Sequence, residues 1–144
     1  MSEKQVNDMD EPLNLVLFSG TDDRLNAAVV LAAGAAALGR PVNIFLQYWA
    51  LDAFRKDRVT ADHGAAPEGG PGAPALIRAS QEGPRHWSNV LRQAKEIGDV
   101  KIHACALSME LFGIGQADLD PLVDDVEGVA SFMGDAEGGP IAFI

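Results

Sequence analysis

The chain has 144 residues, of which 47% are apolar, and a formal net charge of −10. This length fits one domain with a substantial core. The acidic balance argues against partners that are nucleic acids or anionic membrane surfaces, because both need clustered Lys and Arg.

Residues 1–12 are polar and mostly acidic, which predicts a disordered tail rather than a signal peptide. The longest apolar stretch, residues 27–38, is too short to span a bilayer. With a single cysteine, no internal disulfide is possible, and we expect a reducing, cytoplasmic location.

Short apolar runs alternate with helical patterns along the rest of the chain. Strands are predicted at 13–18, 42–47 and 100–104, near 126, and at 141–144; helices are predicted at about 22–38, 50–56, 87–97, 106–112 and 129–136, with a helical turn at 116–119. The segment 58–83 is rich in Gly, Pro and Ala and shows no sustained period, so we predict a long mobile loop there.

This alternation predicts one α/β domain over 13–144, a three-layer α/β/α architecture around a mainly parallel five-stranded sheet, as in flavodoxin-like folds. Ligands of such folds collect beyond the carboxyl ends of the strands. The predicted strands end at Ser19-Gly20, at Tyr48-Trp49 and at Cys105, so we expect these residues to share one edge of the molecule.

Cys105 lies where a predicted strand passes into a predicted helix. Backbone N–H groups and the helix dipole favour a thiolate at such a position, and Ser108 in the first turn is placed to hydrogen-bond the sulfur. The alternative is a small buried side chain, which is what most free cysteines are, with Ser108 as an ordinary capping serine.

Spacing tests restrict the chemistry of this thiol. Leu111 stands where a cysteine phosphatase needs arginine, Ile102 stands where a peroxiredoxin needs threonine, and the Cys-x-x-Cys redox pair is absent. A rhodanese-type loop would place cations directly after the thiol, where this chain has Ala-Leu. Of the thiol chemistries considered, the one that remains is a thiol that accepts a chemical group and passes it on.

The other candidate residues are supporting ones. His103 shares a strand face with Cys105 and is interpreted either as a proton partner or as a packed histidine. Two ligands make no tetrahedral set, so no metal site is predicted. Ser19 and Gly20 offer backbone donors to an anion, but the glycine motifs of nucleotide sites are missing, and no cofactor is predicted. Tyr48 and Trp49 serve either as packing or as an apolar wall beside the sulfur.

Four blocks of the chain together resemble the DsrE/DsrF-like family, in particular its DsrE-like branch that is found with rhodanese-like and TusA-like proteins. The blocks are Leu15–Gly20, Phe45–Trp49, Lys101–Ile114 and the ending from Val129–Phe132 to Phe143–Ile144. The resemblance covers roughly 13–57 and 84–144. In one respect the chain departs from the branch: relatives often carry a Met- and Lys-rich insert where this chain has its Gly/Pro/Ala-rich segment.

The resemblance implies a small α/β domain that forms homotrimers or hexamers and carries sulfur on a cysteine, here Cys105, as a persulfide or thiosulfonate. It implies transfer between partner proteins in sulfur relay or sulfur oxidation, at most a sulfurtransferase activity. Two alternatives stay open: a non-catalytic assembly subunit with a structural Cys105, and a small-molecule binder at the carboxyl edge of the strands.

Overall fold

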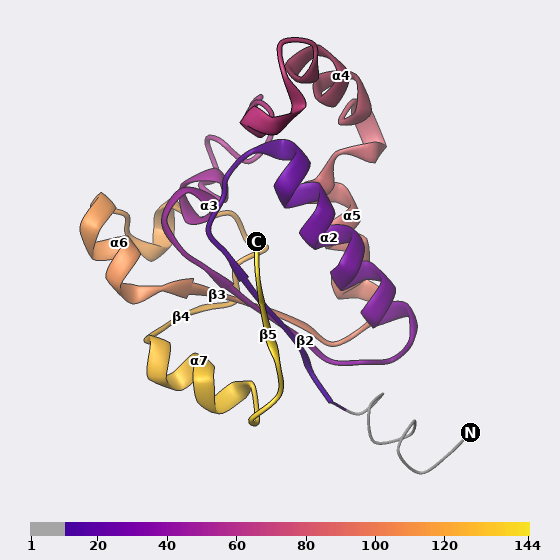
Figure 1. Cartoon of the computed structure of the whole chain (residues 1–144). Coiled ribbons are helices and arrows are strands. Elements are labelled where there is room, and N and C mark those ends of the chain that lie inside the picture. Colours follow the sequence, from indigo (N-terminus) through magenta and orange to yellow (C-terminus); the bar gives the residue numbers. More distant parts are fainter. Residues whose placement is uncertain (1–10) are drawn as a thin grey trace.

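The protein forms a five-stranded, fully parallel sheet in the computed structural model, which describes residues 11–144 (Figure 1). The strands lie in the order β4-β3-β2-β1-β5, and they span Leu13–Leu17 (β1), Val42–Leu46 (β2), Val100–Cys105 (β3), Asp125–Glu127 (β4) and Ile141–Phe143 (β5). The predicted fold class is confirmed. The first twelve residues were expected to form a disordered tail, and positions 1–10 of it lie outside the described residues.

One face of the sheet is covered by two long helices, α2 (Asp22–Ala37) and α5 (Trp87–Ile97), which pack beside each other (Figure 1). The strand positions that face them are apolar and fully buried, as in Leu15, Ile44 and Ile102. Burial of this continuous apolar surface is the main stabilising contribution to the fold.

The opposite face carries the alternate positions of the same strands, because side chains of a strand alternate between faces. Asn14, Phe45, His103 and Cys105 point to this side, and α7 (Val129–Asp135) lies over it (Figure 1). Two short helices, α3 (Tyr48–Ala53) and α6 (Ala106–Phe112), follow β2 and β3 directly and contact each other at the carboxyl end of the sheet.

Regular structure within 58–83 is the main difference from the predicted elements. Helix α4 (Ala73–Ser80) and the 3-10 turns Pro67–Gly69 and Gly83–Arg85 lie in or reach into this stretch, so the prediction of a loop without helix is wrong. The helix buries only Ala73 and exposes Leu76, so it leaves no apolar period in the sequence.

The same stretch is tied to the start of α2. Asp22 Oδ2 accepts a hydrogen bond from the His63 amide at 2.9 Å, and the Asp23 carboxylate accepts from the Ala66 amide at 3.0 Å. Residues 63–66 therefore lie against the first turn of α2, where carboxylates are also favoured by the helix dipole.

Candidate functional site

Cys105 ends β3 and is the N-cap residue of α6, as the sequence predicts, but its side chain makes no capping hydrogen bond. Only 5% of the residue is exposed. It packs in a small apolar cluster with Phe45 and Phe132, against which Val16 and Ile141 also lie. The thiol is thus held in an apolar setting on the face of the sheet that α7 covers.

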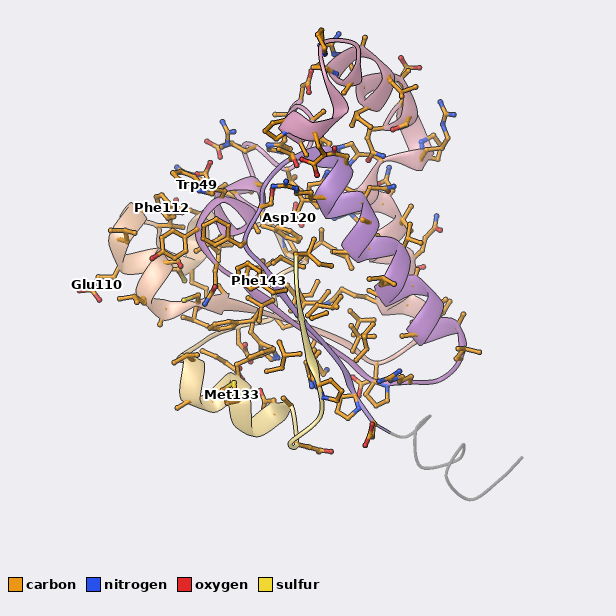
Figure 2. The ribbon with its side chains drawn as sticks, in the orientation of Figure 1. Trp49, Glu110, Phe112, Asp120, Met133 and Phe143 are labelled. Atoms are coloured by element: carbon orange, nitrogen blue, oxygen red, sulfur yellow. The ribbon has the colours of Figure 1, made fainter. Side chains whose placement is uncertain are left out.

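Helix α7 supplies the lid of this cluster through one side chain. Phe132 is the buried residue of the helix, and its ring stacks on that of Phe45 with centroids 4.8 Å apart and an angle of 13° between the planes. Its neighbour Met133 points outward and is exposed (Figure 2). Phe132 of α7 therefore shares one buried apolar cluster with Phe45 and Cys105.

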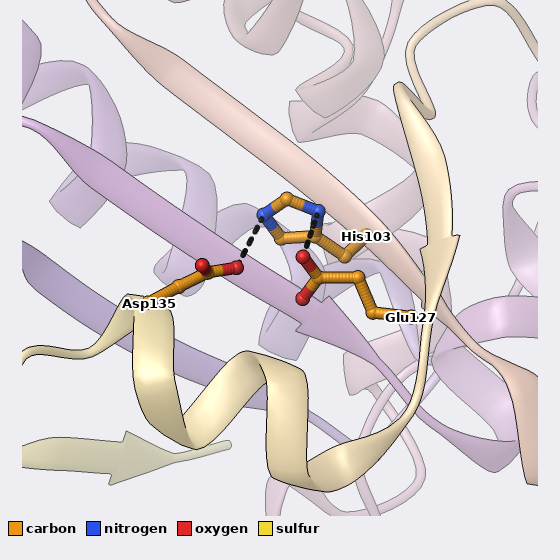
Figure 3. Close-up of side chains that lie close together, drawn as sticks. All are labelled: His103, Glu127 and Asp135. Carbon is orange, nitrogen blue, oxygen red and sulfur yellow. Dashed lines mark ion pairs between the residues drawn. The ribbon is translucent and has the colours of Figure 1, made fainter.

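His103 lies on the same sheet face, two residues before Cys105, but its described partners are carboxylates. Nδ1 donates to Asp125 Oδ1 at 2.5 Å. Nδ1 also lies 3.5 Å from Glu127 Oε1, and Nε2 lies 3.9 Å from Asp135 Oδ2 (Figure 3). Nε2 and Glu127 Oε2 are both buried and have no hydrogen-bond partner in the described part of the chain. The structure places the histidine in an acidic cluster.

The acidic cluster changes the proton affinity of its members. Burial, and next the hydrogen bond with Asp135, raise the pKa of Glu127 to about 7, although the charge of His103 acts in the opposite direction. An open groove of about 600 Å³ reaches the cluster, and its walls include His103, Glu127 and Asp135. The cluster is therefore accessible from solvent on the α7 face.

Ser108 does not contact the thiol as the sequence analysis allowed. Its buried hydroxyl accepts a hydrogen bond from the backbone N–H of Tyr48 at 3.1 Å. Tyr48 has a positive φ of 44°, which is uncommon for a residue other than glycine. Ser108 thereby holds the turn between β2 and α3, and Tyr48 and Trp49 open that helix instead of ending the strand.

Ser19, Gly20 and Trp49 come together at the carboxyl end of β1. They line a pocket of about 350 Å³ with Arg58 and His63 on its other walls. A Cβ on Gly20 would lie 2.4 Å from the Trp49 carbonyl oxygen, so glycine is needed for this close approach. The Trp49 ring, which is 55% exposed, packs against Phe112 of α6 at 5.4 Å (Figure 2).

The predicted site residues thus fall into two groups. Ser19, Gly20 and Trp49 share the pocket at the end of β1, whereas His103 and Cys105 lie under α7. Tyr48 and Ser108 belong to neither group, because they pair with each other at the turn between β2 and α3. Glu127 and Asp135 are not predicted from the sequence, although one signal is present: two acids at alternate positions, Asp125 and Glu127, share a strand face. Only the pairing of β4 with β3 puts that face beside His103.

Taken together, these observations define an open parallel α/β domain with a single, covered cysteine at a strand-to-helix junction. The chain belongs to the DsrE/DsrF/DrsH-like family, whose model matches residues 9–82 and 79–144. Membership suggests a function related to sulfur relay.

Relatives agree with this placement. The chain is 31% identical over 155 aligned positions to "Uncharacterized protein YrkE" of Bacillus subtilis, covering 88% of this chain and 92% of that protein. Its fold resembles the protein of unknown function MTH1491 from Methanobacterium thermoautotrophicum, with a TM-score of 0.60, 15% identity, and 94% and 100% of the two chains covered. It also resembles YchN of E. coli, with a TM-score of 0.53, 14% identity, and 94% and 99% covered. Both structural likenesses concern the fold alone.

Within residues 11–144, none of the helices has the length and apolar character needed to cross a membrane.

Proposed function

We propose that this protein is a sulfur carrier that holds a persulfide or thiosulfonate on Cys105 and passes it between partner proteins. The observation that supports this most directly is the position of the chain's only cysteine, at the end of β3 and at the N-cap of α6, in a member of this family. The family relation supplies the sulfur chemistry, and the single thiol supplies the one residue of this chain that can perform it.

The loading step is a thiol exchange. The Cys105 thiolate attacks the outer sulfur of a donor persulfide, a new bond forms to Cys105 Sγ, the donor's S–S bond breaks, and the donor leaves as a thiolate. The thiosulfonate forms when the thiolate attacks an inner sulfur of tetrathionate: the central S–S bond breaks and thiosulfate leaves. Unloading repeats the same step with an acceptor thiolate as the attacking group. No external oxidant or reductant is consumed, and no second cysteine is present to release the sulfur as an internal disulfide.

The surroundings of Cys105 suit storage of the carried sulfur more than free turnover. Phe45 and Phe132 enclose the thiol in apolar side chains, which limits contact with water and with small thiol reductants. Loading then requires a shift of α7 or engagement of that helix by a partner. This role as shield falls to the two phenylalanines, because Trp49 lines the pocket at the end of β1.

Partner proteins are the remaining part of the proposal. From the family relation we propose donors and acceptors of the rhodanese-like and TusA-like types and a homotrimeric or hexameric assembly. From the single cysteine we propose a cytoplasmic location. The net charge of −10 favours a partner with a basic docking surface, since complementary charge speeds encounter.

Intact-mass analysis tests the carrier function. The full chain and its Cys105→Ser variant are incubated with polysulfide, thiosulfate or tetrathionate, and their masses are compared before and after reduction. We expect a reducible adduct of one sulfur atom or one thiosulfonate group on the native protein only. An equal gain on the serine variant, or no gain on the native protein, would contradict the proposal.

A second candidate is a non-catalytic assembly subunit, and the burial of Cys105 favours it. Large apolar side chains are also exposed on α6, α7 and β5: Leu107, Leu111, Val129, Met133 and Phe143. In this alternative the thiol is packing and stays unreactive in the native oligomer. Size-exclusion chromatography with light scattering, combined with thiol titration of the native assembly, separates the two functions.

A further inference from the structure

The acidic cluster around His103 has more negative charge than the histidine can balance. Three carboxylates, those of Asp125, Glu127 and Asp135, lie within 3.9 Å of its ring nitrogens. A fully protonated imidazole supplies one positive charge to these three groups. Like charges this close destabilise one another unless a cation or a proton joins them.

The unpartnered nitrogen is the second, independent observation. His103 is 95% buried, and Nε2 faces the Asp135 carboxylate at 3.9 Å without any hydrogen-bond partner among residues 11–144. Nδ1 is already engaged by Asp125 at 2.5 Å. A histidine whose Nδ1–H is held by a carboxylate presents the lone pair of Nε2, which is the arrangement found around metal-bound histidines.

We propose that His103 Nε2, Glu127 and Asp135 bind a divalent transition-metal ion of the Zn²⁺ class, with Asp125 orienting the histidine. One ligand atom of each of the three residues lies within 4.8 Å of the others. Zinc takes nitrogen and carboxylate ligands at about 2.0–2.2 Å, so side-chain shifts of about 1 Å close the site. Three protein ligands leave a fourth position for a ligand from the groove that these residues line.

The donor set favours this class of ion over Ca²⁺ or Mg²⁺. An imidazole nitrogen suits zinc and its neighbours, whereas the hard cations prefer oxygen alone. Two carboxylates and a neutral histidine also balance the charge of a divalent ion, which removes the repulsion between Glu127 and Asp135.

The three ligands come from three elements: His103 from β3, Glu127 from β4 and Asp135 from the last turn of α7 (Figure 3). A bound ion would therefore fasten the end of α7 to the sheet. The site is separate from the sulfur chemistry, because Cys105 is not among its ligands.

Metal titration of the untagged full chain in the Cys105→Ser background tests the site, since the thiol is then absent as a competing ligand. We expect one equivalent of Zn²⁺ or Co²⁺ to bind by calorimetry, with an absorption band for bound Co²⁺. At a hundredfold excess over Kd, the melting temperature should rise by about 9 °C.

Two variants and one control decide the assignment. Asp135→Asn and His103→Gln should each weaken Zn²⁺ binding at least tenfold, whereas Glu137→Gln, which removes a carboxylate from the wall of the same groove, should leave it unchanged. If His103→Gln fails to fold, the Asp135→Asn result decides, because that side chain is 41% exposed. Absence of saturable binding, or native affinity in Asp135→Asn, would overturn the proposal. The metal titration does not depend on sulfur loading of Cys105. Failure of the proposed carrier function would therefore leave the result of this titration valid.

Discussion

The shielding of Cys105 by Phe132 gives the sharpest prediction. Phe132→Ala removes a side chain that is 1% exposed, stacks on Phe45 and belongs to the same buried cluster as Cys105. Truncation of a buried phenylalanine to alanine costs about 3–5 kcal/mol. This lost free energy mainly weakens the packing of α7 on the sheet, because Phe132 is the buried side chain of that helix.

The expected change in the reaction rate of Cys105 follows from the equilibrium between the closed and open positions of α7. If the helix recloses faster than a reagent attacks, the reaction rate of Cys105 is proportional to the open population. Each 1.4 kcal/mol changes that population about tenfold. A loss of about 3 kcal/mol therefore accelerates the reaction by about 10²-fold, up to the rate of a fully exposed thiol.

The assay is the pseudo-first-order reaction of Cys105 with an aromatic disulfide reagent at neutral pH. The rate of the urea-unfolded chain sets the upper limit, and circular dichroism verifies that each variant is folded. Met133→Ala, one residue along the same helix at an exposed position, should react at the native rate.

Leu91→Ala is the decisive control. Leu91 is fully buried on α5, which covers the opposite face of the sheet, and its truncation costs a comparable 2–5 kcal/mol. If this variant reacts as fast as Phe132→Ala while both are folded, the thiol is exposed by global unfolding. Exposure of Cys105 by local opening of α7 would then be refuted. A native rate in folded Phe132→Ala would refute it as well.

Three further predictions concern the other site residues. Gly20→Ala should destabilise the fold by about 1–3 kcal/mol in urea unfolding, because its Cβ would meet the Trp49 carbonyl oxygen at 2.4 Å. Ser108→Ala should lower the free energy of unfolding by about 1–3 kcal/mol, since it leaves the Tyr48 N–H without its acceptor. The raised pKa of Glu127, about 7, means that the folded protein binds more protons than the unfolded one between about pH 4.5 and 7, so stability should fall as pH rises through that window. Glu127→Gln, measured with a metal chelator present, should flatten this dependence and be more stable above pH 7 by about 1–2 kcal/mol, less than the full shift implies because solvent screens the site.

Each of these has a matched comparison. Gly34→Ala, at an exposed helical position with no atom within 4 Å of the added Cβ, should leave stability equal or improved. In Ser108→Ala the thiol rate of Cys105 should stay native, and a marked change would mean that the serine acts on the sulfur. A pH dependence that is identical in Glu127→Gln and native protein would show that another group causes it.

Much of the fold follows from local sequence patterns. Buried runs such as Val42–Leu46 and helix stops such as Gly39 are decided by residues close together in the chain, and they predict the alternating parallel architecture. Cys105 at a strand-to-helix junction is predictable for the same reason. Helix α4 was missed because it lies at the surface and buries only Ala73, so packing imposes no apolar period on it.

The sequence by itself determined the class of fold, the family and the one thiol available for sulfur chemistry. Only the tertiary structure decided that Phe132 packs in one cluster with that thiol, that Ser108 holds Tyr48, and that Glu127 and Asp135 lie beside His103. These contacts join residues 24 to 60 positions apart in sequence. They depend on the pairing of β4 with β3, on the return of α7 across the sheet and on the contact of α3 with α6. Long-range neighbours of this kind leave no periodic pattern in the chain, because their distance depends on the packing of whole elements.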